Sequence, residues 1–292
     1  MNDFNASYKK ILHVLKTITG KENFLNQRRK PKLTDIELIA INLTAEYLSI
    51  DSECQLFRKL PCKLKRKIER SVYNRRRRRL FFVIEEIRKK LSDQFNKYEN
   101  YYIVDSMPLE VVKLSRSNRS KICKEDFHTS PDKGYSASQK MYYYGYKLHA
   151  VCSIDGVIKS FDLTKASVHD VHYLNDIKTQ LKNCVLLGDK AYISTEHQLD
   201  LFESCGIKLE VPMRQNQNKY KPQPNIFRRT RKRIETIFSQ LCDQFMIRRN
   251  YAKSFNGFKT RILSKITSLT LIQFLNKFVL KRKINNIKVS II

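Results

Sequence analysis

Three acidic residues occupy positions where a carboxylate could do chemistry. Asp105 ends the apolar run 101–105, Asp189 ends the apolar run 185–189, and Glu235 lies in the basic stretch 228–235. The chain around them holds 57 Lys and Arg against 28 Asp and Glu, a formal net charge of +29. Carboxylates that face a polyanion need cations between them. Oxygen ligands favour Mg²⁺ or Mn²⁺ over zinc, and a pair of such ions can cleave and rejoin phosphodiesters.

The predicted elements bring these carboxylates toward one place. Asp105 and Asp189 each follow a short buried strand, and strand ends border the ligand crevice of α/β sheets. Glu235 lies at the edge of an apolar helical stripe, and Arg231, one turn earlier, can orient Glu235 or hold a phosphate. The stripe consists of Ile234, Phe238, Leu241 and Phe245. Each acid alone also fits a plainer role, a turn or cap for Asp and a helix salt bridge for Glu, so only the ordered trio is specific.

A second polar group, at 164–172, follows the strand of a predicted hairpin. Asp170 is placed to cap the next helix, while His169 could bond a carboxylate or the scissile phosphate. Structural capping is the favoured interpretation. His149 and His172 are predicted to be packing residues.

The charge of +29 and pI of about 9.9 favour a nucleic-acid partner, with strongly salt-dependent binding. A membrane surface fits less well, because the basic residues are spread along the chain. The longest apolar pattern, 262–280, is interrupted by polar residues and predicts an amphipathic helix. Seven cysteines without a Cys-x-x-Cys pair are typical of reduced thiols in an intracellular protein.

The first hundred residues predict helices, with a capping box formed by Thr34 and Glu37. Residues 58–90 hold 15 Lys or Arg against three Glu and include five consecutive arginines. This segment predicts a small DNA-binding domain in which the arginines contact phosphates, the alternative being a solvated helix face. The arginines are Arg75, Arg76, Arg77, Arg78 and Arg79. The aromatics of this region, Phe82 among them, are predicted to be core rather than stacking surfaces.

From about residue 101 the pattern alternates between strands and helices and predicts an α/β layered domain. The expected elements are a strand at 101–105, a hairpin of 147–153 and 158–163, helices at 170–181 and 195–204, strands at 185–188 and 208–211, and a long basic helix from Arg228. The polar segments 113–144 and 214–225 are predicted to be an extended loop and a linker.

Five ordered motifs in this second part resemble the DDE transposases of bacterial insertion sequences. They are Ile-Val-Asp-Ser at 103–106, Tyr-Gly-Tyr-Lys-Leu-His at 144–149, Ala-Ser-Val-His-Asp at 166–170, Leu-Gly-Asp-Lys-Ala-Tyr at 187–192 and Arg-Lys-Arg-Ile-Glu-Thr-Ile-Phe-Ser-Gln-Leu at 231–241. The resemblance implies an RNase H-like mixed sheet flanked by helices, after a small all-helical N-terminal domain. The expected boundaries are 1–100, 101–280 for the catalytic domain and 281–292 for a basic tail.

The resemblance also implies a site and an activity. Asp105, Asp189 and Glu235 stand at the family's two Asp and one Glu positions, and the resemblance implies that they hold two Mg²⁺ or Mn²⁺ ions. The implied reaction is cleavage at the ends of a mobile element and strand transfer into target DNA. Supporting residues are His169, Asp170 and Lys190, with Arg228, Arg231 and Lys232 toward DNA.

Partners and alternatives follow from the same resemblance. Double-stranded DNA is the expected partner, a homodimer would bring two element ends together, and the expected location is the cytoplasm, at the nucleoid. The chain departs from many relatives by holding Arg228 where they have Tyr and Cys242 where they have Lys. The alternatives are a DNA-binding protein derived from a transposase that no longer cuts, and a stand-alone metal-dependent nuclease.

Overall fold

The contacts of the chain divide it into two compact units. The computed structural model describes residues 3–27, 29–95, 100–137, 139–213 and 220–292. Unit 1 combines residues 1–95 with 240–292, and unit 2 comprises 96–239. This partition differs from the expected boundaries at 100 and 280, because the helices after residue 240 pack with the N-terminal helices.

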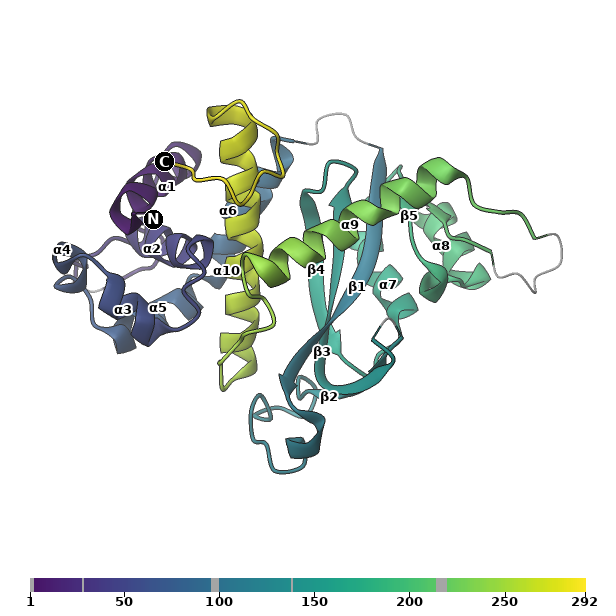
Figure 1. Cartoon of the computed structure of the whole chain (residues 1–292), viewed down its shortest axis with the longest axis horizontal. Helices are drawn as coiled ribbons and strands as arrows, with labels where there is room; N and C mark the ends of the chain where they lie inside the picture. The colour runs from purple at the N-terminus through teal and green to yellow at the C-terminus, as the bar shows by residue number, and fades with distance from the viewer. Residues whose placement is uncertain (1–2, 28, 96–99, 138, 214–219) are drawn as a thin grey trace. The chain divides into compact units, whose positions relative to one another are not determined.

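Unit 1 is helical, as predicted for the N-terminal region. Its second helix begins at the expected capping box: the Glu37 amide donates to Thr34 Oγ1 at 3.2 Å, and the Thr34 amide donates to Glu37 Oε2 at 2.8 Å. The helices are α1 (Phe4–Thr19), α2 (Asp35–Tyr47), α3 (Glu53–Lys59), α4 (Cys62–Lys65), α5 (Arg70–Arg79), α6 (Phe81–Asp93) and α10 (Phe255–Phe274), which a π-helical turn, Leu275–Val279, continues (Figure 1).

The helix α10 is buried around nearly its whole circumference, whereas the sequence predicted an amphipathic helix over 262–280. Its polar side chains find buried partners. Ser264 Oγ accepts from Asn42 at 2.7 Å, and Lys265 Nζ donates to Glu46 at 2.5 Å. Burial is tolerated because these groups remain hydrogen-bonded. No helix in the described part of the chain combines the length and apolar character needed to cross a membrane.

Unit 2 contains a mixed six-stranded sheet, as the predicted fold class requires. Strands β2, β3 and β1 run antiparallel in that order, β4 pairs with β3, and β1, β5 and β6 are parallel. The strands are β1 (Tyr101–Val112), β2 (Asp132–Ser136), β3 (Met141–Ser153), β4 (Ile158–Lys165), β5 (Val185–Leu187) and β6 (Lys208–Glu210). The hairpin of β3 and β4 turns at Gly156, whose φ of +89° favours glycine.

Part of the segment predicted as a loop is sheet. β2 and the first residues of β3 lie within 113–144, where Tyr135 pairs with Tyr142 and Lys133 with Tyr144. The tyrosines supply the β propensity that the polar composition of the segment concealed. Of the predicted linker 214–225, residues 214–219 lie outside the described residues.

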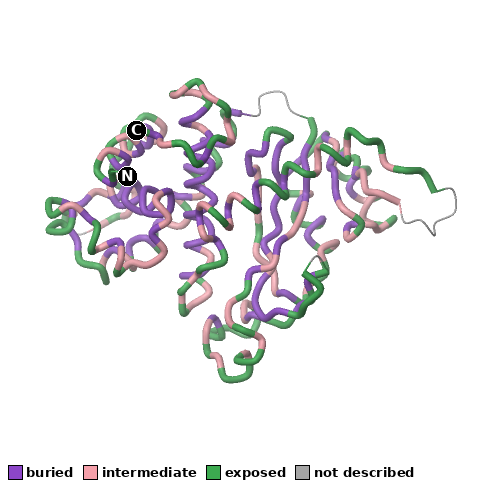
Figure 2. The backbone as a smooth tube through the Cα atoms, in the orientation of Figure 1, coloured by how far each residue is buried: buried purple, intermediate pink, exposed green. Residues whose placement is uncertain are grey.

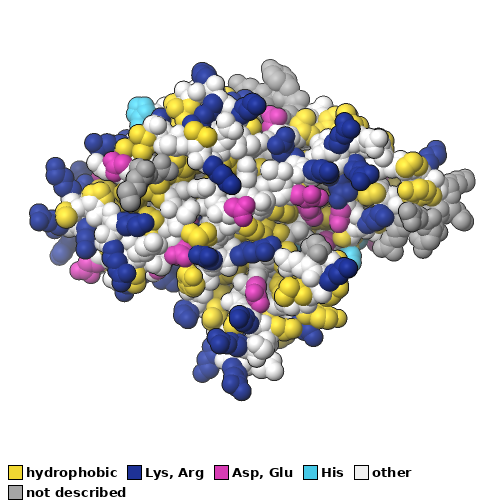
Figure 3. Space-filling model, in the orientation of Figure 1, with side chains coloured by type: hydrophobic (Ala, Val, Ile, Leu, Met, Phe, Trp, Pro, Cys, Tyr) yellow, Lys and Arg dark blue, Asp and Glu magenta, His cyan; other side chains and the backbone are white. Residues whose placement is uncertain are grey.

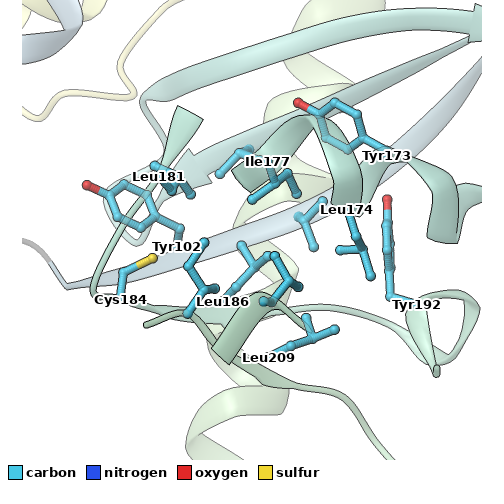
Figure 4. Packing of buried hydrophobic residues seen from close by; sticks show 13 residues of the cluster. Tyr102, Tyr173, Leu174, Ile177, Leu181, Cys184, Leu186, Tyr192 and Leu209 are labelled. Atoms are coloured by element: carbon cyan, nitrogen blue, oxygen red, sulfur yellow. The ribbon is translucent and has the colours of Figure 1, made fainter. Parts of the chain in front are cut away.

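Helices cover both faces of the sheet. On one face α7 (Tyr173–Gln180) and α8 (Thr195–Cys205) enclose a hydrophobic cluster in which Tyr102, Leu186 and Tyr192 pack together (Figure 4). Burial is most continuous along β3, whereas most residues of β4 are of intermediate exposure (Figure 2). On the other face lies α9 (Asn225–Asp243), where a Cβ added to Gly156 would meet side-chain atoms of Arg233 and Ile237. The sheet is therefore a rigid platform between two helical layers.

Candidate active site

Asp105 and Asp189 lie on neighbouring parallel strands. Tyr101 pairs with Val185, and Ile103 pairs with Leu187. Continuing this register by two residues sets Asp105 beside Asp189, on strands about 4.8 Å apart. The structure thus brings together the two aspartates that the sequence singled out.

Backbone amides fix one oxygen of each carboxylate. Asp105 Oδ1 accepts from the Ser106 amide at 2.7 Å, and Asp189 Oδ1 accepts from the Ala191 amide at 2.8 Å. The second bond forms because Asp189 caps the 3₁₀ turn Lys190–Tyr192. Among the described residues, no hydrogen bond holds the other oxygen, Oδ2, of either carboxylate.

Both carboxylates are costly to ionise in this site. Burial raises the pKa of Asp105 to about 7, and the charges of Asp189 and Asp170 contribute in the same direction. The Ser106 amide and the Arg231 guanidinium oppose the rise. Burial also raises the pKa of Asp189, and the Ala191 amide and Arg231 oppose it. A cation bound between two such carboxylates would remove this cost, because it favours their ionised form.

Asp170 belongs to the same electrostatic neighbourhood but makes different contacts from those predicted. Its Oδ1 accepts from Ser106 Oγ at 3.0 Å and from Lys147 Nζ at 3.1 Å, and Lys147 also donates to the Val168 carbonyl at 2.8 Å. It does not cap the following helix. The cap of the 3₁₀ turn Asp170–His172 is His169, whose Nδ1 accepts from the Val171 amide at 3.5 Å.

His149 is a packing residue, as expected. It is fully buried, its ring stacks on Tyr173 at 4.8 Å, and its Nε2 lies 2.8 Å from Thr164 Oγ1. Burial lowers the pKa of His149 to about 4, which keeps the ring neutral at neutral pH.

The sequence did not assign Lys147, Ser106 or Tyr192 to the site. Tyr192 is fully buried, and the pKa of its hydroxyl is raised, first by burial and then by the charges of Asp170, Asp105 and Asp189. All three residues lie in the motifs that resemble DDE transposases, and that position is the sequence feature that could have assigned them to the site.

Glu235 is exposed on α9, one helical turn after Arg231, and Lys190 is exposed next to Asp189. Arg228 and Lys232 are exposed on the same helix. Within the described residues, no group of three or more His, Cys, Asp or Glu side chains is close enough to hold a metal ion. The described arrangement therefore pairs Asp105 with Asp189 and leaves Glu235 outside the pair. The predicted apolar stripe of α9 is buried. Ile237, which was not predicted to belong to the stripe, is buried as well.

The five arginines of α5 divide into two groups. Arg76 is buried and donates to Asp35 Oδ1 at 2.5 Å, and Arg77 is buried and donates to Glu53 Oε1 at 2.8 Å. Both guanidinium groups are thus engaged inside unit 1 and are not presented to a partner, contrary to the prediction of a continuous phosphate-contacting run. The difference arises because their acidic partners are distant in sequence.

The other three arginines, Arg75, Arg78 and Arg79, are exposed and line a groove of about 450 Å³. Phe82, which the sequence analysis assigned to the core, is 80% exposed in this groove, and Lys259 of α10 completes its basic lining. More widely, Lys and Arg side chains are spread over the visible face in Figure 3.

Comparison with known proteins places the chain in a family. Residues 99–271 match the family model described as "Transposase DDE domain". No curated protein sequence matches the chain. Among solved structures, the chain is similar to one titled "Mos1 transposase paired-end complex with left transposon end", with 10% identity, 82% of this chain and 86% of that chain covered, and a TM-score of 0.25. The mixed sheet between helices is the RNase H-like arrangement. The family match covers more than half of the chain and contains Asp105, Asp189 and Glu235. This chain therefore belongs to the transposase DDE domain family.

Proposed function

We propose that this protein is an active transposase that cleaves DNA at the ends of an insertion sequence and joins the freed 3′ hydroxyl to target DNA. The observation that supports this proposal is the pairing of Asp105 with Asp189 on adjacent parallel strands. Each carboxylate has one oxygen held by a backbone amide and a raised pKa. Two partly buried acids side by side are costly to ionise without a counter-charge.

The donor set fits hard divalent cations, a pair of Mg²⁺ or Mn²⁺ ions. Asp105 and Asp189 would hold it, with Glu235 as the third ligand. When bound, such ions activate an attacking oxygen and stabilise a leaving oxygen at phosphorus. Glu235 is exposed one helical turn after Arg231, so its carboxylate would have to turn toward the aspartates to join them as a ligand.

Other residues of the unit orient the site and its substrate. Arg231 carries a positive charge close enough to act on both Asp105 and Asp189 and would hold a DNA phosphate beside them. Arg228 and Lys232 would bind neighbouring phosphates. Asp170, by accepting from Ser106 and Lys147, keeps the chain around Asp105 in place.

Strand cleavage and joining can be tested directly. Purified protein is incubated with a labelled duplex from the element end, a target plasmid and Mg²⁺, and nicked and joined products are resolved. Asp189→Asn should abolish both products while leaving duplex binding intact. Asp176→Asn, an exposed aspartate on α7, is the matched control and should react like the wild type. Wild-type nicking by Asp189→Asn would reject the assignment. Nicks without joined products would indicate a nuclease, and binding without nicks would indicate a silent DNA-binding protein.

We also propose that the groove of α5, α6 and α10 binds the duplex through Arg75, Arg78, Arg79 and Lys259, and that two copies pair on DNA to join two ends. Each lost phosphate contact reduces the slope of log K against log salt by about 0.9. Changing the three arginines to Gln should therefore lower the slope by up to about 3, whereas changing them to Lys, which keeps the charge, should preserve it. An unchanged slope in the Gln variant would show that these arginines face solvent and do not contact DNA phosphates.

A further inference from the structure

The hairpin of β2 and β3 carries exposed tyrosines that the proposed catalytic site does not use. Tyr135 is 52% exposed and Tyr142 is 55% exposed. They are direct cross-strand partners, and their ring centroids lie 5.0 Å apart at an interplanar angle of 59°. Exposed aromatic pairs on a strand hairpin leave ring surface open to solvent, which a partner with flat apolar groups can cover.

Lysines accompany these rings. Lys133 Nζ lies 4.4 Å from the centroid of the Tyr142 ring, and Lys124 Nζ lies 5.5 Å from that of Tyr144. Lys165 Nζ lies 4.8 Å from the ring of Phe127, which is 82% exposed. The surface formed by Phe127, Tyr135, Tyr142, Lys124, Lys133 and Lys165 is called the aromatic–lysine surface below.

Strand register places the strand residues of this surface, Tyr135, Tyr142, Lys133 and Lys165, on the face of the sheet that carries Asp105. Lys133 pairs with Tyr144, Lys165 pairs with Tyr146, and Asp105 pairs with Ala150. The even-numbered residues of β3 from 142 to 150 share one face, because side chains alternate along a strand. From Ala150 to Tyr142 the strand spans about 26 Å, the length of about eight base pairs of DNA.

The charge of the region also suits a polyanion. Residues 113–144 contain seven Lys or Arg against three Asp or Glu. Asp132 is one of the three, but it precedes Lys133 on β2 and therefore points to the opposite face. A surface that combines lysines with open aromatic rings has the two features by which proteins hold unpaired nucleotides: cations for the backbone and rings on which bases stack.

We propose that the aromatic–lysine surface binds unpaired DNA, with bases stacked on Tyr135 and Tyr142 and phosphates on Lys133. Paired bases inside a duplex cannot reach these rings, so the surface selects single-stranded or locally opened DNA. The inference rests on the proposed DNA substrate and adds a conformational preference to it. It requires no metal and no cleavage.

The test compares two kinds of DNA in EDTA at constant salt. Binding of a labelled oligo-dT and of a blunt duplex is measured by fluorescence anisotropy for the wild type and for the double variant Tyr135→Leu/Tyr142→Leu. Loss of one base–aromatic stack weakens binding by about fivefold or more. We expect at least that loss for oligo-dT and less than a twofold change for the duplex.

Two control variants separate stacking from damage to the fold. Tyr135→Phe/Tyr142→Phe keeps both rings and should bind oligo-dT like the wild type. Phe202→Leu removes an exposed ring on α8 and should have no effect. Equal losses for oligo-dT and duplex, a loss in the Phe variant as large as in the Leu variant, or no loss at all would overturn the proposal, as would a change of oligomeric state in place of a binding change. If oligo-dT binding is retained but the separate assay with element-end DNA and Mg²⁺ yields no cleavage, only the proposed function is contradicted.

Discussion

Asp105→Asn should stabilise the protein at neutral and alkaline pH while abolishing its reaction. The wild-type carboxyl has its pKa raised from 3.8 to about 7, chiefly by burial. Asn keeps the shape of the side chain and an oxygen for the Ser106 amide but cannot ionise. The cost of ionising a buried acid is therefore removed in the variant.

The sign and the size follow from linkage. A group with a raised folded pKa contributes stability that is fully present below its unfolded pKa and is lost as pH rises through the folded pKa. The wild type should therefore lose stability, relative to the variant, from about pH 4 to about pH 7. Three pKa units correspond to about 4 kcal/mol. The free energy of unfolding of the variant should exceed that of the wild type by up to this amount at about pH 8, and by little near pH 4.

Urea unfolding of both proteins in EDTA, from about pH 5 to about pH 8, measures this difference. Asp176→Asn, with an exposed carboxyl, should show no such pH dependence. Repeating the series with Mg²⁺ should narrow the difference, because the cation stabilises only the protein that retains the carboxylate pair. A difference of the same size at every pH, or a variant less stable than the wild type at about pH 8, would refute the reasoning.

The remaining predictions concern the fold and the cation. Arg76→Gln should lower the free energy of unfolding by about 3–5 kcal/mol, because it leaves the buried carboxylate of Asp35 without an opposite charge, held only by the Phe24 and Leu25 amides. Arg75→Gln should change the free energy of unfolding by less than about 0.5 kcal/mol. Urea unfolding of the two variants checks this, and equal effects would contradict it. Gly145→Ala should destabilise unit 2 by at least about 1–3 kcal/mol, because the added Cβ would collide with the Leu109 carbonyl oxygen. A melting temperature equal to that of the wild type would argue against this close approach. Chelation of divalent cations should stop strand cleavage but leave duplex binding intact. Nicking and gel-shift assays on the same DNA measure the two effects. Cleavage that persists in EDTA would exclude a divalent cation from the reaction.

Local patterns in the sequence predicted the elements that carry the site. The aspartates follow buried strands, the capping box starts its helix, and the hairpin turns at Gly156, because each of these depends on residues close together in the chain. The sequence patterns did not reveal contacts between residues that lie far apart in the chain. The partner of Arg76 lies 41 residues away, and nothing in the arginine run distinguishes a buried guanidinium from an exposed one.

The same limit explains the other differences. α10 reads as amphipathic because its serines and lysine are polar, but their partners on α2 lie more than 200 positions earlier. Asp170 has the spacing of a helix cap, yet strands β1 and β3 supply Ser106 and Lys147 as stronger partners. The position of Glu235 outside the aspartate pair depends on the side-chain orientation on α9, which periodicity alone does not determine.

Unit 1 is built from two segments that are far apart in the chain, 1–95 and 240–292, and this affects how it folds during synthesis on the ribosome. The buried helix α10 packs against α2 and α6, so these two helices lack that packing until residues 255–274 have been translated. Lys259 of the basic groove arrives at the same late stage. A product that terminates before α10 would therefore lack a complete helical unit.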